Sequence, residues 1–111
     1  MNEVQTADVV SLPVGSVHQV LVALQDPVRL EVVRRLRNAG TALQCAVLYD
    51  GINKSTATHH FKILREAGLT ERLVAEGLTY QRLRTDDVDA AMPGLLDSIV
   101  GIANREVGQR S

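Results

Sequence analysis

The stretch INKSTATHHFKILREAGL, residues 52–69, decides the fold. Asn53 is a favourable helix N-cap residue, and Gly68 stands where a helix commonly ends in a left-handed residue. Between them, apolar residues recur at steps of four and three positions, which is the spacing of one helix face. Those residues are Ala57, Phe61 and Leu64. The stretch therefore predicts an amphipathic helix over 53–67 that packs one face against a core.

Capping patterns mark three further helix starts before this stretch: Ser16 with Gln19, Asp26 before Pro27, and Thr41 with Gln44. The first two open apolar stripes of ordinary helix length, and Gly40 ends the second helix. The third predicts a short helix that stops near Gly51. A short helix, a glycine-containing turn and a capped helix together indicate a helix-turn-helix.

The hydrophobic period changes after Gly68. The segments LTERLV (69–74) and LTYQRLR (78–84) flank a glycine turn and are rich in residues that favour strands, which predicts a β-hairpin. From Asp86 the helical spacing returns, and Pro93 divides this region into a short helix and a longer one. The predicted fold class is mainly α with a small β-hairpin, a winged helix-turn-helix of order α-α-α-α-β-β-α.

Length and composition fit a single globular domain. The chain has 111 residues, of which 45% are hydrophobic and 23% charged. We expect the domain to span 16–106, with a flexible N-terminal arm over 1–15 and a flexible tail over 107–111. The single cysteine, Cys45, excludes an internal disulfide, and neither a secretory leader nor a run of about 18 apolar residues is visible. We therefore expect a cytoplasmic protein.

Positive charge is concentrated in one part of the chain, although the net charge is −1. Residues 54–84 carry six basic and three acidic residues, whereas residues 1–53 carry four and five, and residues 85–111 carry two and five. The basic segment begins with the helix of the opening stretch, which favours a nucleic-acid partner there.

One face of the helix predicted over 53–67 has the side chains that DNA contacts require. Short hydroxyl groups bond phosphates or bases, lysines neutralise phosphate, and a histidine can donate to guanine O6 or N7. These residue types lie away from the apolar face: Lys54, Ser55, Thr56, Thr58, His59 and Lys62. The plainer alternative is an ordinary solvated helix face.

The two adjacent histidines are not expected to share a metal ion. One residue of helix turns the side chain by about 100°, so His59 falls on the polar face and His60 beside the apolar one. Metal ligands on a helix need spacings of three or four, and neither ring has such a partner. We expect a packing or capping role for His60.

Several segments resemble the ArsR/SmtB family of small bacterial transcriptional repressors. They are DPVRLEVVRRL (26–36), STATHHFKILREAGL (55–69) and YQRLR (80–84), and LRTDDVDAAMPGLLDSIV (83–100) is similar to the C-terminal segment of some members. The resemblance covers residues 16–103. It implies a homodimer whose helix over 53–67 enters the DNA major groove while the hairpin, the wing, touches the flanking backbone or minor groove.

The wing departs from the family's usual basic tip, because its turn is Ala75-Glu76-Gly77. Positive charge lies on its strands instead. We expect Arg72 and Arg82 to reach phosphate, as the likelier pair if they are cross-strand neighbours.

The family's usual metal ligands are missing. Metal sensors of the family often carry a Cys-x-Cys motif in the third helix, and here Gln44 and Ala46 occupy those two positions with Cys45 between them. The C-terminal metal site of other members needs histidines, and none follows His60. No cofactor is identified, and Cys45 and His18 are left as the weaker metal candidates. A lone cysteine is more often a small buried hydrophobe.

The terminal helices carry more apolar residues than one small domain is expected to cover, so we expect them to pair across a twofold axis. The expected dimer residues are Val17, Val20, Leu21, Leu24, Leu95, Leu96, Ile99 and Ile102. Two reading helices about 34 Å apart would then match a pseudo-palindromic DNA site. The alternative is that both helices only complete the monomer core.

These features predict a sequence-specific DNA-binding transcriptional regulator, a dimeric repressor controlled by an unidentified signal. The signal could be a metal, a redox change, a small molecule or a partner protein. The alternative is a winged-helix module that docks a protein without reading DNA, although residues 54–62 offer no methionine anchor and keep their one aromatic, Phe61, for the core. No nucleophile–base pair, paired carboxylates or phosphate-binding loop points to an enzyme.

Overall fold

The helix predicted over 53–67 is present as α3, Lys54–Glu66, in the computed structural model of the chain, which describes residues 5–6 and 12–109. The predicted fold class is confirmed as five α-helices with a small antiparallel sheet. The other elements, in chain order, are β1 (Gln5–Thr6), α1 (Val17–Leu24), α2 (Pro27–Ala39), β2 (Leu43–Gln44), the single-turn helix η1 (Cys45–Val47), β3 (Thr70–Ala75), β4 (Leu78–Leu83), α4 (Thr85–Ala91) and α5 (Leu95–Gln109).

The helix starts follow the capping patterns of the sequence. The side chains of Ser16, Asp26 and Asn53 accept backbone N–H groups in the first turns of α1, α2 and α3 at 2.8–3.1 Å. Gly40 ends α2 in the left-handed region, with φ 68°. Local chemistry therefore fixes where these three helices begin.

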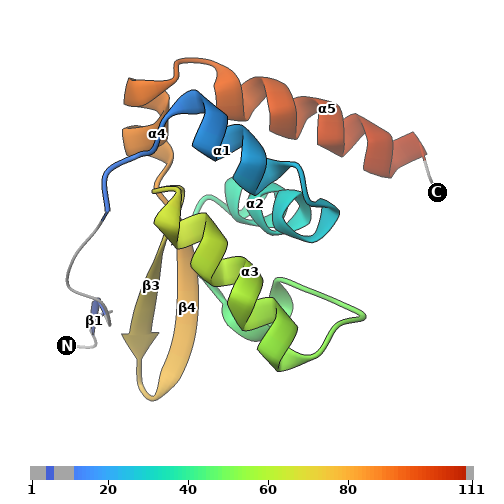
Figure 1. The fold of residues 1–111 in the computed structure, drawn as a ribbon. Coiled ribbons are helices and arrows are strands. Elements are labelled where there is room, and N and C mark those ends of the chain that lie inside the picture. The colour runs from blue at the N-terminus through green and yellow to red at the C-terminus, as the bar shows by residue number, and fades with distance from the viewer. Residues whose placement is uncertain (1–4, 7–11, 110–111) are drawn as a thin grey trace.

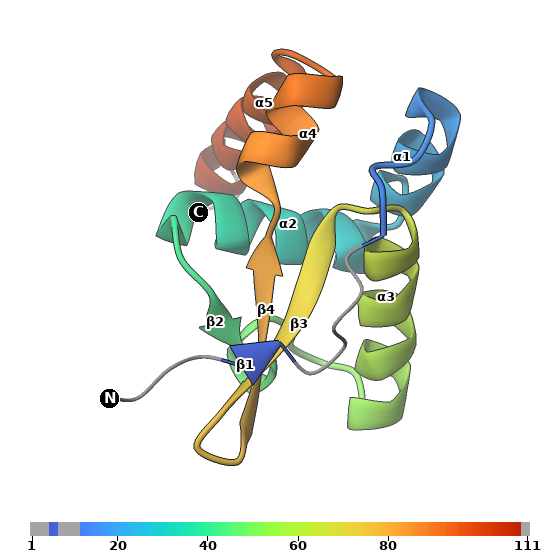
Figure 2. The same cartoon turned by 90° about the vertical axis from the view of Figure 1, so that its left-hand side faces the viewer.

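The helix α2 lies at the centre of the molecule (Figures 1 and 2). The helices α1, α4 and α5 lie on one side of it, and α3 and the β3–β4 hairpin lie on the other. No helix within the described residues is both long and apolar enough to cross a membrane. The core that joins the two sides includes the fully buried side chains of Val20, Val32, Val33, Leu36, Leu48, Leu64, Leu69, Val88 and Leu96.

The sheet is antiparallel throughout and has the strand order β1-β3-β4-β2. The hairpin joins β3 to β4 through Glu76 and Gly77, which both have positive φ values of 53° and 78°. Two left-handed residues give a turn whose twist matches that of the flanking strands. The hairpin therefore projects as a wing beside α3.

The short helix predicted from Thr41 is wrong in its details. Leu43 and Gln44 form β2, which pairs with Gln81 and Tyr80 of β4, and only one turn of 3₁₀ helix follows. Pairing with β4 takes the backbone groups that a capped helix would have used. The helix that precedes α3 is therefore η1, and the loop between them begins with Leu48, whose side chain is buried in the core.

The expected arm and tail are partly ordered. The α5 helix continues to Gln109, so residues 107–109 of the expected tail are helical, and residues 110–111 lie outside the described residues. In the expected arm, β1 pairs with β3, and the Gly15 N–H donates to the Ala67 carbonyl at 2.9 Å. Residues 1–4 and 7–11 of that arm lie outside the described residues.

Gly68 lets the segment before α1 cross the end of α3. Its φ is 80°, and a Cβ at this position would lie 2.4 Å from the carbonyl oxygen of Pro13. Only glycine satisfies both the left-handed backbone and this close approach. The glycine of the opening stretch therefore has a second role beyond ending the helix.

A charged network ties α2 to the loop before α3. Glu31 accepts from Arg34 at 2.7 Å and from Arg35 at 2.7 Å, and Arg35 also donates to Asp50 at 2.6 Å. The hydrogen bond from Arg34 and then that from Arg35 outweigh the opposing effect of burial and lower the pKa of Glu31 to about 2.

This network should make stability depend on acid. A carboxylate whose pKa falls on folding contributes stability that is complete above its unfolded pKa and is lost as the pH falls through the folded pKa. We expect the free energy of unfolding to decline between pH 4.5 and about 2 as Glu31 takes up a proton. Urea unfolding across this range should give a steeper decline for the wild type than for Glu31→Gln, and equal slopes would contradict the assignment.

Candidate nucleic-acid interface

The helix α3 divides into a buried face and an exposed polar face. Ala57, Phe61 and Leu64 lie in the core, as their spacing predicted. All six residues expected to read DNA on this helix are exposed: Lys54, Ser55, Thr56, Thr58, His59 and Lys62. One hydroxyl is engaged locally, because Thr58 Oγ1 donates to the Lys54 carbonyl at 2.9 Å. The lysines and the positive end of the helix dipole make this face attractive to phosphate.

The two histidines lie in different surroundings. His59 is exposed, whereas the His60 side chain is only 12% exposed and its Nδ1 lies 3.0 Å from Arg29 Nη1 and 3.9 Å from Asp26 Oδ1. The ring centroids are 6.2 Å apart. The expected packing role of His60 is confirmed, and its partners are polar groups of α2. Within residues 5–6 and 12–109, no three histidine, cysteine or acidic side chains are grouped to hold a metal ion.

Arg29 of α2 contacts both α1 and α3 and so joins the three helices. This buried guanidinium donates to the carbonyls of Ala23 at 2.7 Å and Val22 at 3.4 Å, at the end of α1, and contacts His60 of α3. Burial would raise the pKa of Asp26, but backbone N–H groups and the charges of His60 and Arg29 lower it overall. The ionised Asp26 thus caps α2 beside Arg29, and this cluster links α2 to the end of α1 and, through His60, to α3.

The burial of Arg29 could have been predicted from its position in the sequence, although a charged residue is usually assigned to the surface. Arg29 stands three, four and seven residues before Val32, Val33 and Leu36, so it occupies an inward position of the α2 stripe. A charged residue at an inward helix position indicates a buried polar cluster.

The contrast between the two histidines gives a stability prediction. His60→Ala should lower the free energy of unfolding by about 1–2 kcal/mol, because it leaves the Arg29 guanidinium short of a partner inside the fold. The neighbouring exposed change His59→Ala is the matched control and should cost less than about 0.5 kcal/mol. Urea unfolding followed by circular dichroism measures both, and equal losses would contradict the different roles.

Arg72 and Arg82 are not cross-strand neighbours, so the condition under which they were expected to contact phosphate as a pair is not met. The register places Arg82 opposite Glu71 and Arg72 opposite Gln81. Neighbouring positions along a strand point to opposite faces, so the two arginines lie on different sides of the hairpin. Only Arg72 lies on the side of α3, where it lines a pocket together with Lys54 and Arg65.

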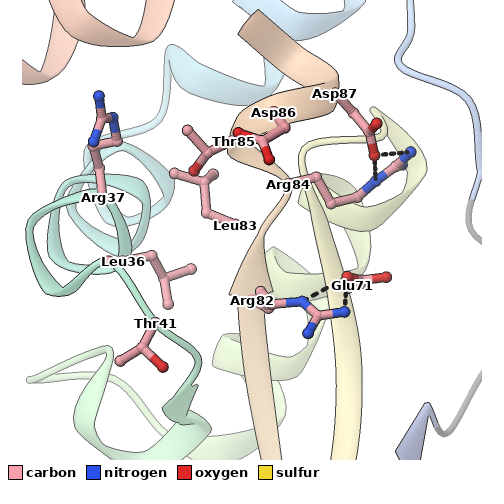
Figure 3. Close-up of a pocket in the computed structure, with 11 residues that line it drawn as sticks. Leu36, Arg37, Thr41, Glu71, Arg82, Leu83, Arg84, Thr85, Asp86 and Asp87 are labelled. Carbon is pink, nitrogen blue, oxygen red and sulfur yellow. Dashed lines mark hydrogen bonds and ion pairs between the residues drawn. The ribbon is translucent and has the colours of Figure 1, made fainter.

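The arginines of β4 and its end are engaged within the protein. Arg82 Nε donates to Glu71 at 2.7 Å, and Arg84 donates to Asp87 at 3.1–3.2 Å (Figure 3). Arg84 also donates to the carbonyl of Gly68 at 3.1 Å and to that of Leu12. Arg84 is therefore a structural residue, and Arg82 is neutralised by its cross-strand partner.

Arg65 belongs to the positive surface although the sequence reasoning did not select it. It lies two helical turns beyond Thr58 on α3, on the side that faces the hairpin, and lines the same pocket as Lys54 and Arg72. No acidic side chain among the described residues forms an ion pair with any of these three cations. Its spacing of seven residues from Thr58 could have placed Arg65 on the same side of the helix from the sequence alone.

The residues expected to form a dimer divide into two groups. Val20, Leu24 and Leu96 are buried in the core of the single chain, and Leu95 and Ile99 are partly buried against it. Val17, Leu21 and Ile102 are 55%, 47% and 49% exposed. The first group completes the monomer because α1 and α5 both pack on the central region, and only the second group leaves apolar surface uncovered.

The weaker metal candidates do not come together with other ligands. His18 is exposed on α1, and Cys45 is partly buried beside Gln81 in the sheet, with its Sγ 3.7 Å from Gln81 Nε2. The wing tip at Glu76 is exposed and acidic.

Known proteins are similar to this chain in sequence and in fold. A family described as a helix-turn-helix domain matches residues 24–72. YceK of Bacillus subtilis (strain 168), an uncharacterized HTH-type transcriptional regulator, is 39% identical over 83 residues, which cover 73% of this chain and 83% of YceK. The crystal structure of the transcriptional repressor BigR from Xylella fastidiosa is similar with a TM-score of 0.61 and 26% identity, over 78% of this chain and 84% of BigR.

Proposed function

Because the chain belongs to the HTH-type transcriptional regulators and is a DNA-binding protein of that class, we propose that it acts as a homodimeric repressor of the ArsR/SmtB type. The observation that carries this proposal is the exposed face of α3, where six polar and basic side chains lie opposite the residues that α3 buries in the core. The ArsR/SmtB assignment rests on the motifs DPVRL and HHFKILREAGL.

In the proposed complex, α3 lies in the major groove. Lys54 and Lys62 neutralise phosphates, and His59 donates to a base edge such as guanine O6 or N7. The wing contributes Arg72 from the side that faces α3, and Arg82 contributes little because Glu71 holds it. Sequence preference should therefore come mainly from α3.

The proposed dimer forms through α1 and α5. The apolar side chains that the single chain leaves exposed on these helices would be covered by the same surface of a second copy: Val17, Leu21, Val22, Ile102 and Val107. A twofold axis through this surface would set two copies of α3 on one side of the dimer, about one turn of DNA apart. Such a dimer represses by occupying a pseudo-palindromic operator at a promoter.

The hairpin arginines provide a test of how the wing binds. Arg72→Ala should weaken binding to a selected operator duplex by about 5–10-fold, because it removes a cation that forms no ion pair with a described acidic residue. Arg82→Ala is the matched control on the opposite face of the hairpin and should weaken binding by less than about twofold. Fluorescence anisotropy at fixed salt measures both. A larger loss for Arg82→Ala would reject the proposed use of the wing.

A further inference from the structure

A cavity of about 500 Å³ lies between α3 and the hairpin, beside the face proposed to read DNA. Its walls come from α3, from η1 and from the two strands of the wing. Small-molecule sites commonly have volumes of about 300–1,000 Å³. The size therefore suits a compact organic molecule.

One polar atom of a buried amide in the cavity wall lacks a hydrogen-bond partner among the described residues. Gln81 is 1% exposed and its Nε2 lies 3.7 Å from Cys45 Sγ, but its Oε1 is buried and makes no hydrogen bond to any described residue. Turning the amide exchanges its oxygen and nitrogen, which puts an N–H donor at the open position and turns the amide oxygen toward the Cys45 thiol. Buried polar groups are nearly always satisfied, and an anionic group that enters the cavity would accept a hydrogen bond from the turned amide.

The charge of the lining selects an anion. Lys54, Arg65 and Arg72 all contribute to the walls, and none of the described residues that line the cavity carries a carboxylate. The remaining surface is largely apolar, since Tyr49 and Phe61 meet edge to face with centroids 6.1 Å apart and Leu78 stands at the wing. An anionic head with a small apolar body satisfies both parts of the cavity.

We propose that this cavity binds a small organic anion and that the bound anion weakens DNA binding. The second part rests on the proposed function, because Lys54, Thr58 and Arg72 line the cavity and also belong to the surface proposed for DNA. An anion seated among these side chains neutralises the charge that the DNA backbone would use. In this proposal the bound anion is the signal that controls DNA binding, and its site requires no metal ion.

The binding step can be tested without DNA. Cys45 is the only cysteine of the chain and lines the cavity, so its alkylation by neutral iodoacetamide reports occupancy. The probes are benzoate and the equally sized cation benzamidinium, each at about 10 mM, a concentration that detects millimolar binding. Benzoate should slow alkylation at least threefold and benzamidinium should not. Equal protection by both probes, or by neither, would overturn the proposed site.

Two variants identify the buried amide as part of the site. Gln81→Leu replaces the amide with an apolar group of similar size and should remove the protection by benzoate. Thr70→Val is the matched control, because Thr70 is also buried in the hairpin with an unpartnered hydroxyl but does not line the cavity. Protection should persist in Thr70→Val. Thermal melts establish that both variants are folded, and protection that survives in folded Gln81→Leu would contradict the role of the amide.

The regulatory step is read from operator binding in the same samples. Benzoate should weaken operator binding of wild type and Thr70→Val at least threefold and leave Gln81→Leu unchanged. Protection of Cys45 without any loss of operator binding would overturn the regulatory role. If the wild type binds the operator but benzoate does not protect its Cys45, the cavity site is overturned and the proposed function stands. If the wild type fails to bind the operator even without benzoate, the proposed function is rejected.

Discussion

Replacing Lys54 and Lys62 together by glutamine should weaken operator binding about 100-fold at moderate salt and reduce its salt dependence. These are the only lysines of the chain, both are exposed on α3, and no acid among the described residues forms an ion pair with them. Each phosphate contact that is lost lowers the slope of log affinity against log salt by about 0.9. The double change removes two contacts from each protomer of a dimer, so the slope should fall by about 3 to 4 units.

A matched control separates this local effect from net charge. Ala90→Glu with Ala91→Glu makes the same two-unit change in net charge at exposed positions of α4, on the other side of α2 from α3. Its operator affinity should stay within about threefold of the wild type, because charges separated by more than a Debye length are largely screened. Equal losses in the two variants would mean that DNA binding depends on net charge and that α3 is not the contact.

Charge placed on the exposed apolar surface of α1 and α5 should dissociate the dimer. Leu21→Glu with Ile102→Glu puts two carboxylates per chain where the proposed interface excludes water, and an unpaired buried charge is strongly unfavourable. The dimer dissociation constant should rise at least about 100-fold. Light scattering should then give the mass of one chain, 12.1 kDa, where the wild type gives twice that value.

The control for this change is Val47→Glu, because Val47 is 53% exposed but lies on η1, on the other side of α2. This variant should remain dimeric. The monomeric variant should also lose most of its operator affinity, since one α3 reads only half of the site. A double variant that stays dimeric, or a wild type that is monomeric at micromolar concentration, would reject the interface.

Features that depend on neighbouring residues were predictable from the sequence. The caps at Ser16, Asp26 and Asn53 and the turn at Gly77 act within a few residues, so the helices α1, α2 and α3 and the hairpin were predicted close to their observed bounds. The polar face of α3 was predictable for the same reason, because helical spacing alone separates His59 from His60.

Features that depend on distant partners were not predictable. The segment from Thr41 has a capping pattern, but pairing of Leu43 and Gln44 with β4 overrides it. The register that sets Arg82 against Glu71 follows from the exact length of the turn, and a difference of one residue places Arg72 and Arg82 on opposite faces of the hairpin. For the apolar residues of α1 and α5, the sequence likewise does not show which ones are buried within the monomer and which stay exposed.

The central claim is that two copies of α3 in one dimer read a symmetric DNA site. The most direct measurement is selection of bound duplexes from a random pool by the wild-type protein, followed by sequencing. We expect enrichment of a pseudo-palindrome whose half-sites are centred about 10–10.5 base pairs apart. Enrichment of a single asymmetric half-site, or of no sequence at all, would contradict this claim.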